Sequence, residues 1–133
     1  MKFALTSFFL AVMAAGTTGL QITSPATDDC VDLSQGLQIT WDSVSTDPSV
    51  IKFRLTNYNG ASPPVNRPWP PARHREVLVD TSKGEHSFPG VSRDVAGGLA
   101  DLNDGKGFEI WAVSVNNPGA LAQSGQFRIA SSC

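Results

Sequence analysis

Strict alternation of apolar and polar residues constrains what this chain can fold into more than any other feature. Apolar side chains stand at every second position of residues 37–41, ending at Trp41, and again of residues 51–55. Because successive side chains of a β-strand point to opposite faces of a sheet, each run predicts a strand with one buried and one exposed face. Residues 43–49 between them are rich in turn formers, with Asp47-Pro48 as the turn signal. We therefore expect Trp41 to lie in the core.

Five further runs extend this strand pattern over the chain. They are residues 20–23, 76–80, 84–88, 108–116 and 125–130. Twelve glycines and nine prolines favour short strands and turns over long helices, and only residues 94–102 are expected to form a helical turn. About seven short strands in 133 residues predict an all-β fold, an immunoglobulin- or fibronectin-III-like antiparallel β-sandwich. At this length we expect a single domain, over residues 20–133.

Residues 108–115 are apolar on both faces of their predicted strand. One face carries Phe108, Ile110 and Ala112, and the other carries Trp111, Val113 and Val115. A central strand that is covered on both sides has this pattern, and we expect burial of both faces. The alternative is a sheet whose outer face carries an exposed aromatic patch.

The start of the chain predicts a secretory signal peptide over residues 1–19. Lys2 precedes a largely apolar run, residues 3–15, which at about thirteen residues is too short for a bilayer that needs roughly twenty. Small residues follow, and we expect cleavage after Gly19, or alternatively after Gly16. No later apolar run or hydrophobic C-terminal tail predicts a membrane anchor. We therefore expect a secreted, extracellular protein that is monomeric and unanchored.

Cys30 and Cys133 are the only cysteines of the chain, and both lie outside the predicted signal peptide. In an oxidising compartment such a pair forms a disulfide, so we expect a bond that ties the first strand region to the last residue. Closing a loop of about 100 residues stabilises a fold by roughly 4–5 kcal/mol on a chain-entropy estimate.

Residues 57–75 break the strand pattern, since they contain five prolines and three arginines. Proline lacks the N–H that a central strand needs, so this segment predicts an extended surface loop with polyproline character. Long loops on small domains often carry function.

Trp69 is the strongest candidate for binding within this segment. Prolines on both sides hold it in a stiff stretch, so presenting its indole to a sugar ring or a protein would cost little entropy. The alternative is that Trp69 folds back over the open end of the sandwich. The residues that we expect to bind a ligand or partner are Trp69, Arg67, Arg73, Tyr58 and Trp111.

No residue pattern indicates catalysis or a metal. The chain has no Gly-x-Ser-x-Gly motif that would place a nucleophilic serine. Its two histidines, His74 and His86, lack the spacing of a metal site, and we expect both to be solvated. Aspartates gather at residues 28–32 and 101–104, where turns and solvation explain them more simply than calcium binding does. We therefore expect no enzyme, no metal and no cofactor. A net charge of −2 also argues against nucleic acid as a partner.

Short motifs between residues 20 and 129 form a series. They are Ile22-Thr23-Ser24-Pro25, the run from Gly36 to Trp41, Asp47-Pro48-Ser49, Phe53-Arg54-Leu55, Val79-Asp80-Thr81-Ser82, Phe108-Glu109-Ile110-Trp111 and the run from Ala122 to Ile129. This series resembles the immunoglobulin-like domain of a fungal cell-wall family, the Kre/Knh-type cell-wall synthesis proteins and Ser/Thr-rich GPI-anchored proteins. The resemblance implies a β-sandwich linked to β-glucan assembly or wall architecture, and it carries over no catalytic residues. The chain departs from the family in its proline-rich segment and in lacking a Ser/Thr-rich stalk and anchor signal.

The residues and the resemblance together predict a non-catalytic, secreted fungal protein that acts at the cell wall or at the interface with a host. We expect it to bind β-glucan, another cell-wall polysaccharide or a host protein, and an effector or elicitor role in plants fits a small unanchored domain. Two alternatives stay open. One is a wall-active glycoside hydrolase that uses Asp or Glu, and the other is a purely structural cell-wall protein.

Overall fold

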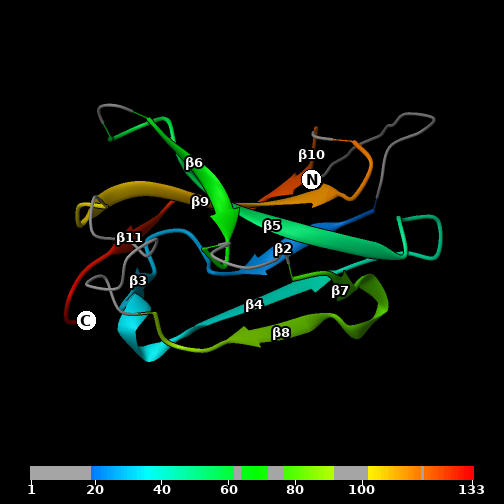
Figure 1. The fold of residues 1–133 in the computed structure, drawn as a ribbon, viewed down its shortest axis with the longest axis horizontal. Helices are drawn as coiled ribbons and strands as arrows, with labels where there is room; N and C mark the ends of the chain where they lie inside the picture. The colour runs from blue at the N-terminus through cyan, green and yellow to red at the C-terminus, as the bar shows by residue number, and fades with distance from the viewer. Residues whose placement is uncertain (1–18, 62–63, 72–76, 92–101, 118) are drawn as a thin grey trace, which may run out of the picture.

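Two stacked β-sheets make up the protein (Figure 1). The computed structural model describes residues 19–61, 64–71, 77–91, 102–117 and 119–133. The smaller sheet has three antiparallel strands in the order β2 (Gln21–Ser24), β4 (Leu37–Asp42) and β8 (Glu85–Phe88). The all-β sandwich that the alternation predicts is therefore confirmed, while its immunoglobulin-like type stays a prediction.

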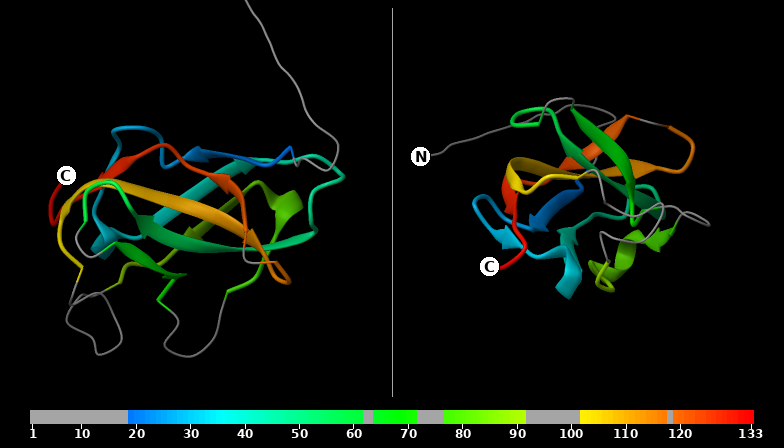
Figure 2. Two further views of the ribbon diagram at one scale, coloured as in Figure 1. Left: turned by 90° about the horizontal axis from the view of Figure 1, so that it is seen from above. Right: turned by 60° about the vertical axis from the view of Figure 1, so that its left-hand side comes forward.

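The larger sheet has seven strands and includes the longest ones. Its main order is β3 (Cys30–Val31), β11 (Phe127–Ile129), β9 (Gly105–Ser114), β5 (Val50–Asn57) and β6 (Val65–Trp69). Two short strands lie off this path, because β10 (Ala120–Gln123) pairs with β9 and β7 (Val79–Asp80) pairs with β5. β3 and β11 pair in parallel, whereas the other described pairs of this sheet are antiparallel. The right-hand view of Figure 2 shows the two sheets as separate layers.

Three strands were not expected from the sequence, namely β3, β6 and β10. The most informative of them is β6, because it lies within the segment predicted to be a surface loop, and that prediction is wrong for Val65–Trp69. Proline is excluded from central strands, but β6 is the last strand of the sheet, where a missing N–H leaves no ladder partner unsatisfied. Pro68 accordingly lies opposite Arg54 of β5.

Two other expectations meet the structure only in part. Within the described residues of the predicted strand at 76–80, only Val79–Asp80 is a strand. The predicted helical turn at 94–102 lies outside the described residues, except for Leu102. Two short 3₁₀ helices, η2 (Leu33–Gln35) and η3 (Thr81–Lys83), are each capped by an aspartate side chain.

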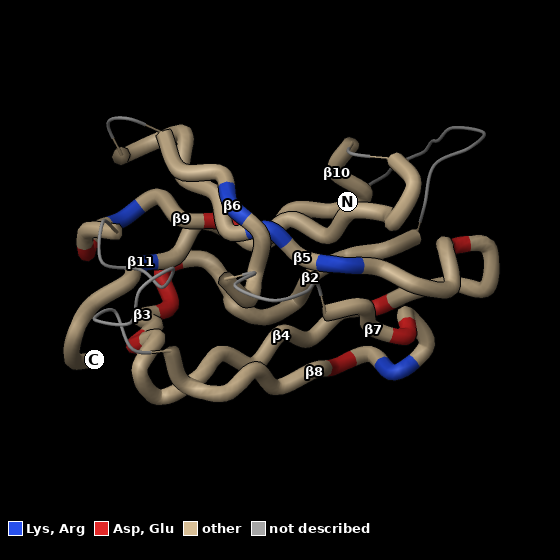
Figure 3. The backbone as a smooth tube through the Cα atoms, viewed as in Figure 1, with Lys and Arg blue, Asp and Glu red and all other residues tan. Residues whose placement is uncertain are grey.

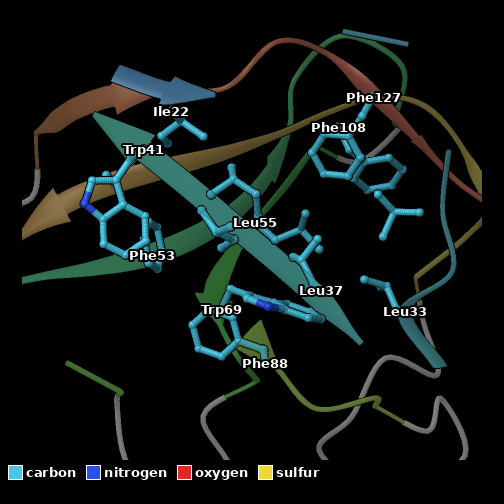
Figure 4. Close-up of a cluster of buried hydrophobic side chains, with 14 of the residues drawn as sticks. Ile22, Leu33, Leu37, Trp41, Phe53, Leu55, Trp69, Phe88, Phe108 and Phe127 are labelled. Atoms are coloured by element: carbon cyan, nitrogen blue, oxygen red, sulfur yellow. The ribbon is translucent and has the colours of Figure 1, made fainter. Parts of the chain in front are cut away.

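The core lies between the two sheets and is rich in aromatic side chains (Figure 4). Phe53 of the larger sheet contacts Trp41 and Phe88 of the smaller one, with ring centroids 5.5 and 6.1 Å apart. Such tilted and edge-on pairs add about 0.5–1.5 kcal/mol each beyond the area that they bury. Trp41 is 3% exposed, and its Nε1 donates a hydrogen bond to the carbonyl of Thr81 at 2.7 Å. The prediction that Trp41 belongs to the core is therefore confirmed.

The predicted disulfide joins Cys30 of β3 to Cys133. It links the edge of the larger sheet to the C-terminal tail across a sequence separation of 103 residues. The same tail is held by Asp104, whose Oδ2 accepts hydrogen bonds from Ser131 N at 3.1 Å and Ser131 Oγ at 2.8 Å. The C-terminus is thus fixed to the sandwich at two points.

The predicted signal peptide falls outside the described residues, apart from Gly19. The N–H of Gly19 donates to Oδ1 of Asp47 at 2.9 Å, and Oδ2 of the same buried carboxylate accepts from Val44 N at 2.7 Å. Cleavage after Gly16 would keep the first of these bonds, and cleavage after Gly19 would remove it. Among the described residues, no helix has the length and apolar character needed to cross a membrane.

Candidate functional site

The outer face of the larger sheet carries aromatic and polar side chains in register. Phe53 of β5 is 2% exposed and points into the core, so the next residue, Arg54, points outward. In the ladder Arg54 lies opposite Trp111 of β9. Because directly opposite residues of antiparallel strands share a face, Trp111 also lies on the outside of the sandwich.

The sequence of β9 allowed two interpretations, burial of both faces or an exposed aromatic patch on the outer face, and each holds for part of the strand. Its inner row, Phe108, Ile110 and Ala112, is buried as expected. On its outer face the expected burial holds for Val113, which is 1% exposed, but it is wrong for Trp111, which is only half-buried, and for Val115, which follows β9 and is 41% exposed. The exposed aromatic patch, which was the alternative, is therefore present around Trp111.

Tyr58, which follows β5 directly, completes this patch. Its ring stacks on Trp111 with centroids 5.7 Å apart and planes inclined by 23°. Tyr58 is itself 52% exposed, so the pair offers an aromatic surface to solvent. The structure thus brings together two of the five residues that the sequence predicted to bind.

Polar side chains fix the positions of the two rings. Nε of Arg54 donates to Oδ1 of Asn66 at 2.6 Å, and Nδ2 of Asn66 donates to the Tyr58 hydroxyl at 2.7 Å. On the other side, Nε1 of Trp111 donates to Oε1 of Glu109 at 3.0 Å. We call this group of residues the outer platform: Tyr58, Trp111, Arg54, Asn66 and Glu109.

The chemistry of the outer platform suits a ligand that has both apolar faces and hydroxyl groups. Stacked aromatic rings offer a flat apolar surface, and the guanidinium, amide and carboxylate around them offer donors and acceptors at its edge. Basic residues gather along the middle of β5 and β6 in Figure 3, while acidic residues lie chiefly toward the ends of the sandwich. The platform therefore has a rigid aromatic centre, with one cationic side chain, Arg54, and one carboxylate, Glu109, at its edge.

Trp69 does not belong to this surface. It is 2% exposed and lies in the core cluster with Leu37 and Phe88 (Figure 4), so the expectation that its indole is presented to a partner is wrong. The physical reason is register, since Trp69 lies opposite Phe53 and therefore shares the inner face. Trp69 thus takes the inward position that the alternative anticipated.

Of the two arginines predicted to bind beside Trp69, the structure describes only Arg67. Arg67 is half-buried and lines a cavity at one end of the sandwich, away from the outer platform, because it alternates with Asn66 on β6. Arg73 lies outside the described residues. The proline-rich segment, residues 57–75, therefore supplies two platform residues, Tyr58, which was predicted, and Asn66, which the sequence did not single out.

Three platform residues were missed by sequence reasoning. Arg54 carried a usable signal, because the alternation of residues 51–55 already turned it outward. Glu109 belongs to the apolar strand at 108–116, whose outer face was expected to be covered. Asn66 could not be found, because its segment was taken as a loop with no sheet face.

Other candidate groups have structural roles. Oδ1 of Asp32 accepts from Ser34 N and Oγ, and Asp80 caps η3 in the same way through Ser82. The hydrogen bonds from the Ser82 side chain and backbone hold the pKa of Asp80 below its ordinary value of 3.8. The His86 ring packs against Phe88, with centroids 4.5 Å apart. His74 lies outside the described part of the chain, and within that part no three or more His, Cys, Asp or Glu side chains gather as a metal site.

Comparison with known proteins relates this chain to a fungal surface protein. It is 40% identical, over 134 aligned positions, to a UPF0619 GPI-anchored membrane protein of Aspergillus fumigatus. The alignment takes in 99% of this chain and 52% of the relative, so the chain spans about half the length of the curated relative that it matches. No protein-family model matches the chain, and no solved structure matches it.

The relative bears on the predicted resemblance at a coarse level. A fungal GPI-anchored relative supports the resemblance to fungal GPI-anchored proteins and an extracellular or cell-surface location, whereas the Kre/Knh type stays a prediction. Its name describes an anchored protein, so the expectation that the present chain is unanchored also stays a prediction. The chain is thus similar, over nearly its whole length, to one half of a fungal GPI-anchored membrane protein.

Proposed function

We propose that this protein is a non-catalytic β-sandwich of the fungal cell surface that binds a cell-wall polysaccharide, β-glucan in the first place, through its outer platform. The observation that carries the proposal is the stacked pair of Tyr58 and Trp111 on the outer face of the larger sheet. Its location rests on the similarity to a GPI-anchored fungal protein.

The stacked pair supplies the main contact. A pyranose ring has an apolar face of C–H groups, which can pack on an aromatic ring without losing hydrogen bonds to water. Tyr58 is 52% exposed and gives such a ring, while Trp111 supports it from beneath. Aromatic side chains with few rotatable bonds bind at little cost in conformational entropy.

The polar rim supplies orientation. Arg54 and Asn66 hold each other and the Tyr58 hydroxyl, so their donors are already in place before a ligand arrives. Preorganised groups lose less entropy on binding than mobile ones. Sugar hydroxyls can therefore bridge between the guanidinium, the amide and the tyrosine hydroxyl.

The platform favours binding over hydrolysis. Glycoside hydrolysis uses two carboxyl groups, about 5–10 Å apart, that flank the scissile bond. The outer platform contains one carboxylate, Glu109, and that group accepts the Trp111 indole N–H. A ligand on the platform would meet two aromatic rings and a guanidinium, and the described residues that form the platform include no second carboxylate.

The test is retention of the purified protein on insoluble β-glucan, chitin and cellulose. We expect retention on β-glucan, and about tenfold weaker retention for Tyr58→Ala, because hot-spot aromatics contribute about 2 kcal/mol or more. Leu78→Ala is the matched control, since Leu78 is an apolar side chain with 51% exposure outside the platform. It should bind as the unchanged protein does.

Other outcomes would redirect the proposal. Equal retention of Tyr58→Ala and Leu78→Ala would remove the platform from glucan binding. Retention on none of the three polysaccharides would contradict a polysaccharide ligand, and the host-protein alternative would then be tested by infiltrating leaves with the protein. Release of sugar from β-glucan would contradict the non-catalytic role.

A further inference from the structure

A cavity of about 340 Å³ opens at one end of the sandwich, between the turn after β5 and the start of β9. Small-molecule sites in proteins have volumes of about 300–1,000 Å³, so this cavity has room for a small ligand. We call it the end cavity. It lies on the other side of β6 from the outer platform, because its lining residues Val65 and Arg67 flank the platform residue Asn66.

The wall of the end cavity is tightly built. Oδ1 of Asn57 accepts from the N–H groups of Asn59 and Gly60 at 3.0 and 2.8 Å, and Nδ2 of Asn57 donates to the carbonyl of Lys106 at 2.9 Å. These bonds fasten the turn after β5 onto β9, and Asn57 is only 2% exposed. One wall of the cavity, between the turn after β5 and the start of β9, is therefore held by hydrogen bonds.

Two glycines make this close approach possible. A Cβ on Gly60 would lie 2.7 Å from the carbonyl oxygen of Lys106, and Gly107 has a φ of +90°, which favours glycine. Any side chain at either position would push the turn away from β9. Glycine at positions 60 and 107 thus allows the close contact that forms this wall of the cavity, and most other residues would disrupt it.

The lining combines apolar and polar groups. Val65 and Phe108 give an apolar surface, while Lys106, Asn103 and Asp104 bring donors and acceptors to the rim. A ligand that suits both has an apolar ring face and several hydroxyl groups. A single sugar residue has this chemistry.

The end cavity and the outer platform lie on opposite sides of β6 and meet in the sequence at the end of β5. Asn57 builds the cavity wall, and the next residue, Tyr58, provides the exposed platform ring. We propose that the end cavity is a second sugar site, separate from the outer platform, which holds one glycosyl unit at the end or a branch of a glucan chain. This inference rests on the proposed function, and it predicts that the protein prefers chain ends or branches over the middle of a linear chain.

The experiment is a titration of the ¹⁵N-labelled protein with a β-linked glucose disaccharide, followed by backbone amide shifts. We expect the amides of Gly60, Gly105 and Gly107 to report the end cavity, and those of Asn66, Glu109 and Trp111 to report the platform. Asn103→Ala and Lys106→Met change exposed rim residues and leave the Asn57 bonds intact. Each should weaken the cavity response about tenfold in its fitted dissociation constant, while Lys83→Met, an exposed lysine of η3, should leave it unchanged.

The outcomes separate this inference from the proposed function. Shifts of the platform amides alone would overturn the end cavity as a sugar site and leave glucan binding in place. Shifts of the cavity amides in a protein that does not bind insoluble glucan would support a sugar site in the cavity and contradict the platform. A cavity that responds to inorganic phosphate but not to the disaccharide would be an anion site, which overturns the inference, and no shift in either set would overturn both proposals.

Discussion

Trp69 and Trp111 lie in the same sheet, yet only one of them offers a ring to solvent. Trp69 of β6 lies opposite Phe53, and Trp111 of β9 lies opposite Arg54. Because Phe53 and Arg54 are consecutive in β5, their side chains point to opposite faces. One step along β5 therefore separates a core tryptophan that is 2% exposed from a half-buried one on the outer platform.

The difference shows that a tryptophan's neighbours along the chain are a poor guide to its exposure. Prolines around Trp69 favoured an exposed loop, and apolar residues around Trp111 favoured burial on both faces. Both expectations were wrong, because the pairing between strands determines which face of the sheet a side chain occupies. The predictions below test whether the two tryptophans have separate roles, one in stability and the other in binding.

The largest effect is expected from Trp69→Ala. Truncating a buried tryptophan leaves a cavity in the core, and such changes cost about 3–5 kcal/mol of unfolding free energy. Urea unfolding followed by fluorescence or circular dichroism would measure the loss. A cost below about 1 kcal/mol would be typical of a surface position and would contradict the core placement.

Trp69→Phe sharpens the same test. Within the described part of the chain, Nε1 of Trp69 is buried with no hydrogen-bond partner. Phenylalanine removes that unsatisfied donor and fills much of the space, so we expect less than about half the cost of Trp69→Ala. Equal losses of unfolding free energy for the two variants would contradict an indole N–H that lacks a hydrogen-bond partner. Folded Trp69→Phe should keep full glucan retention.

Trp111→Ala should reduce glucan binding strongly and stability only moderately, the reverse of what is expected for Trp69. Trp111 is half-buried and stacks on Tyr58, so its truncation should cost only about 1–2 kcal/mol of stability. Glucan retention should fall about tenfold or more, because the ring beneath Tyr58 is lost. Unchanged glucan retention, together with a loss of stability above about 2 kcal/mol, would indicate a core role for Trp111 like that of Trp69.

Tyr58→Phe should have a small effect on binding. The change keeps the stacked ring and removes the hydroxyl that accepts from Nδ2 of Asn66, an exposed amide that water can satisfy. A single neutral hydrogen bond is worth about 0.5–1.5 kcal/mol, so we expect a loss of about two- to tenfold in affinity, less than for Tyr58→Ala. A loss as large as that of Tyr58→Ala would show that the hydroxyl, rather than the ring face, carries recognition.

The smallest effect is expected from Asp80→Asn, because Asp80 caps η3 and belongs to neither the core nor the outer platform. The folded-state pKa of Asp80 is lowered by Ser82, so its ionised form stabilises the fold above the ordinary value of 3.8 and that stability is lost as the pH falls through the lowered pKa. Asparagine can still accept from Ser82 N but does not titrate. Thermal melts should therefore show the variant slightly less stable at neutral pH and equal to the unchanged protein in strong acid. A difference that persists in strong acid would contradict this origin.

Period-two alternation was sufficient to predict the sandwich and much of its core. Trp41 and the residues that alternate with it could be placed because each lies in a strand with one clearly polar face. The disulfide between Cys30 and Cys133 could be predicted because only two cysteines exist. These features depend on local pattern or on counting, so no knowledge of strand pairing was needed.

Strand order and register decided the rest. β6 could form despite Pro68 because it is the last strand of its sheet, and its pairing with β5 sent Trp69 inward and Asn66 outward. The outer platform unites residues from β5, β6 and β9, whose alignment depends on backbone hydrogen bonds between distant segments. A sequence fixes which residues alternate along a strand, but only the packing of one strand against another determines which of the two faces becomes the core.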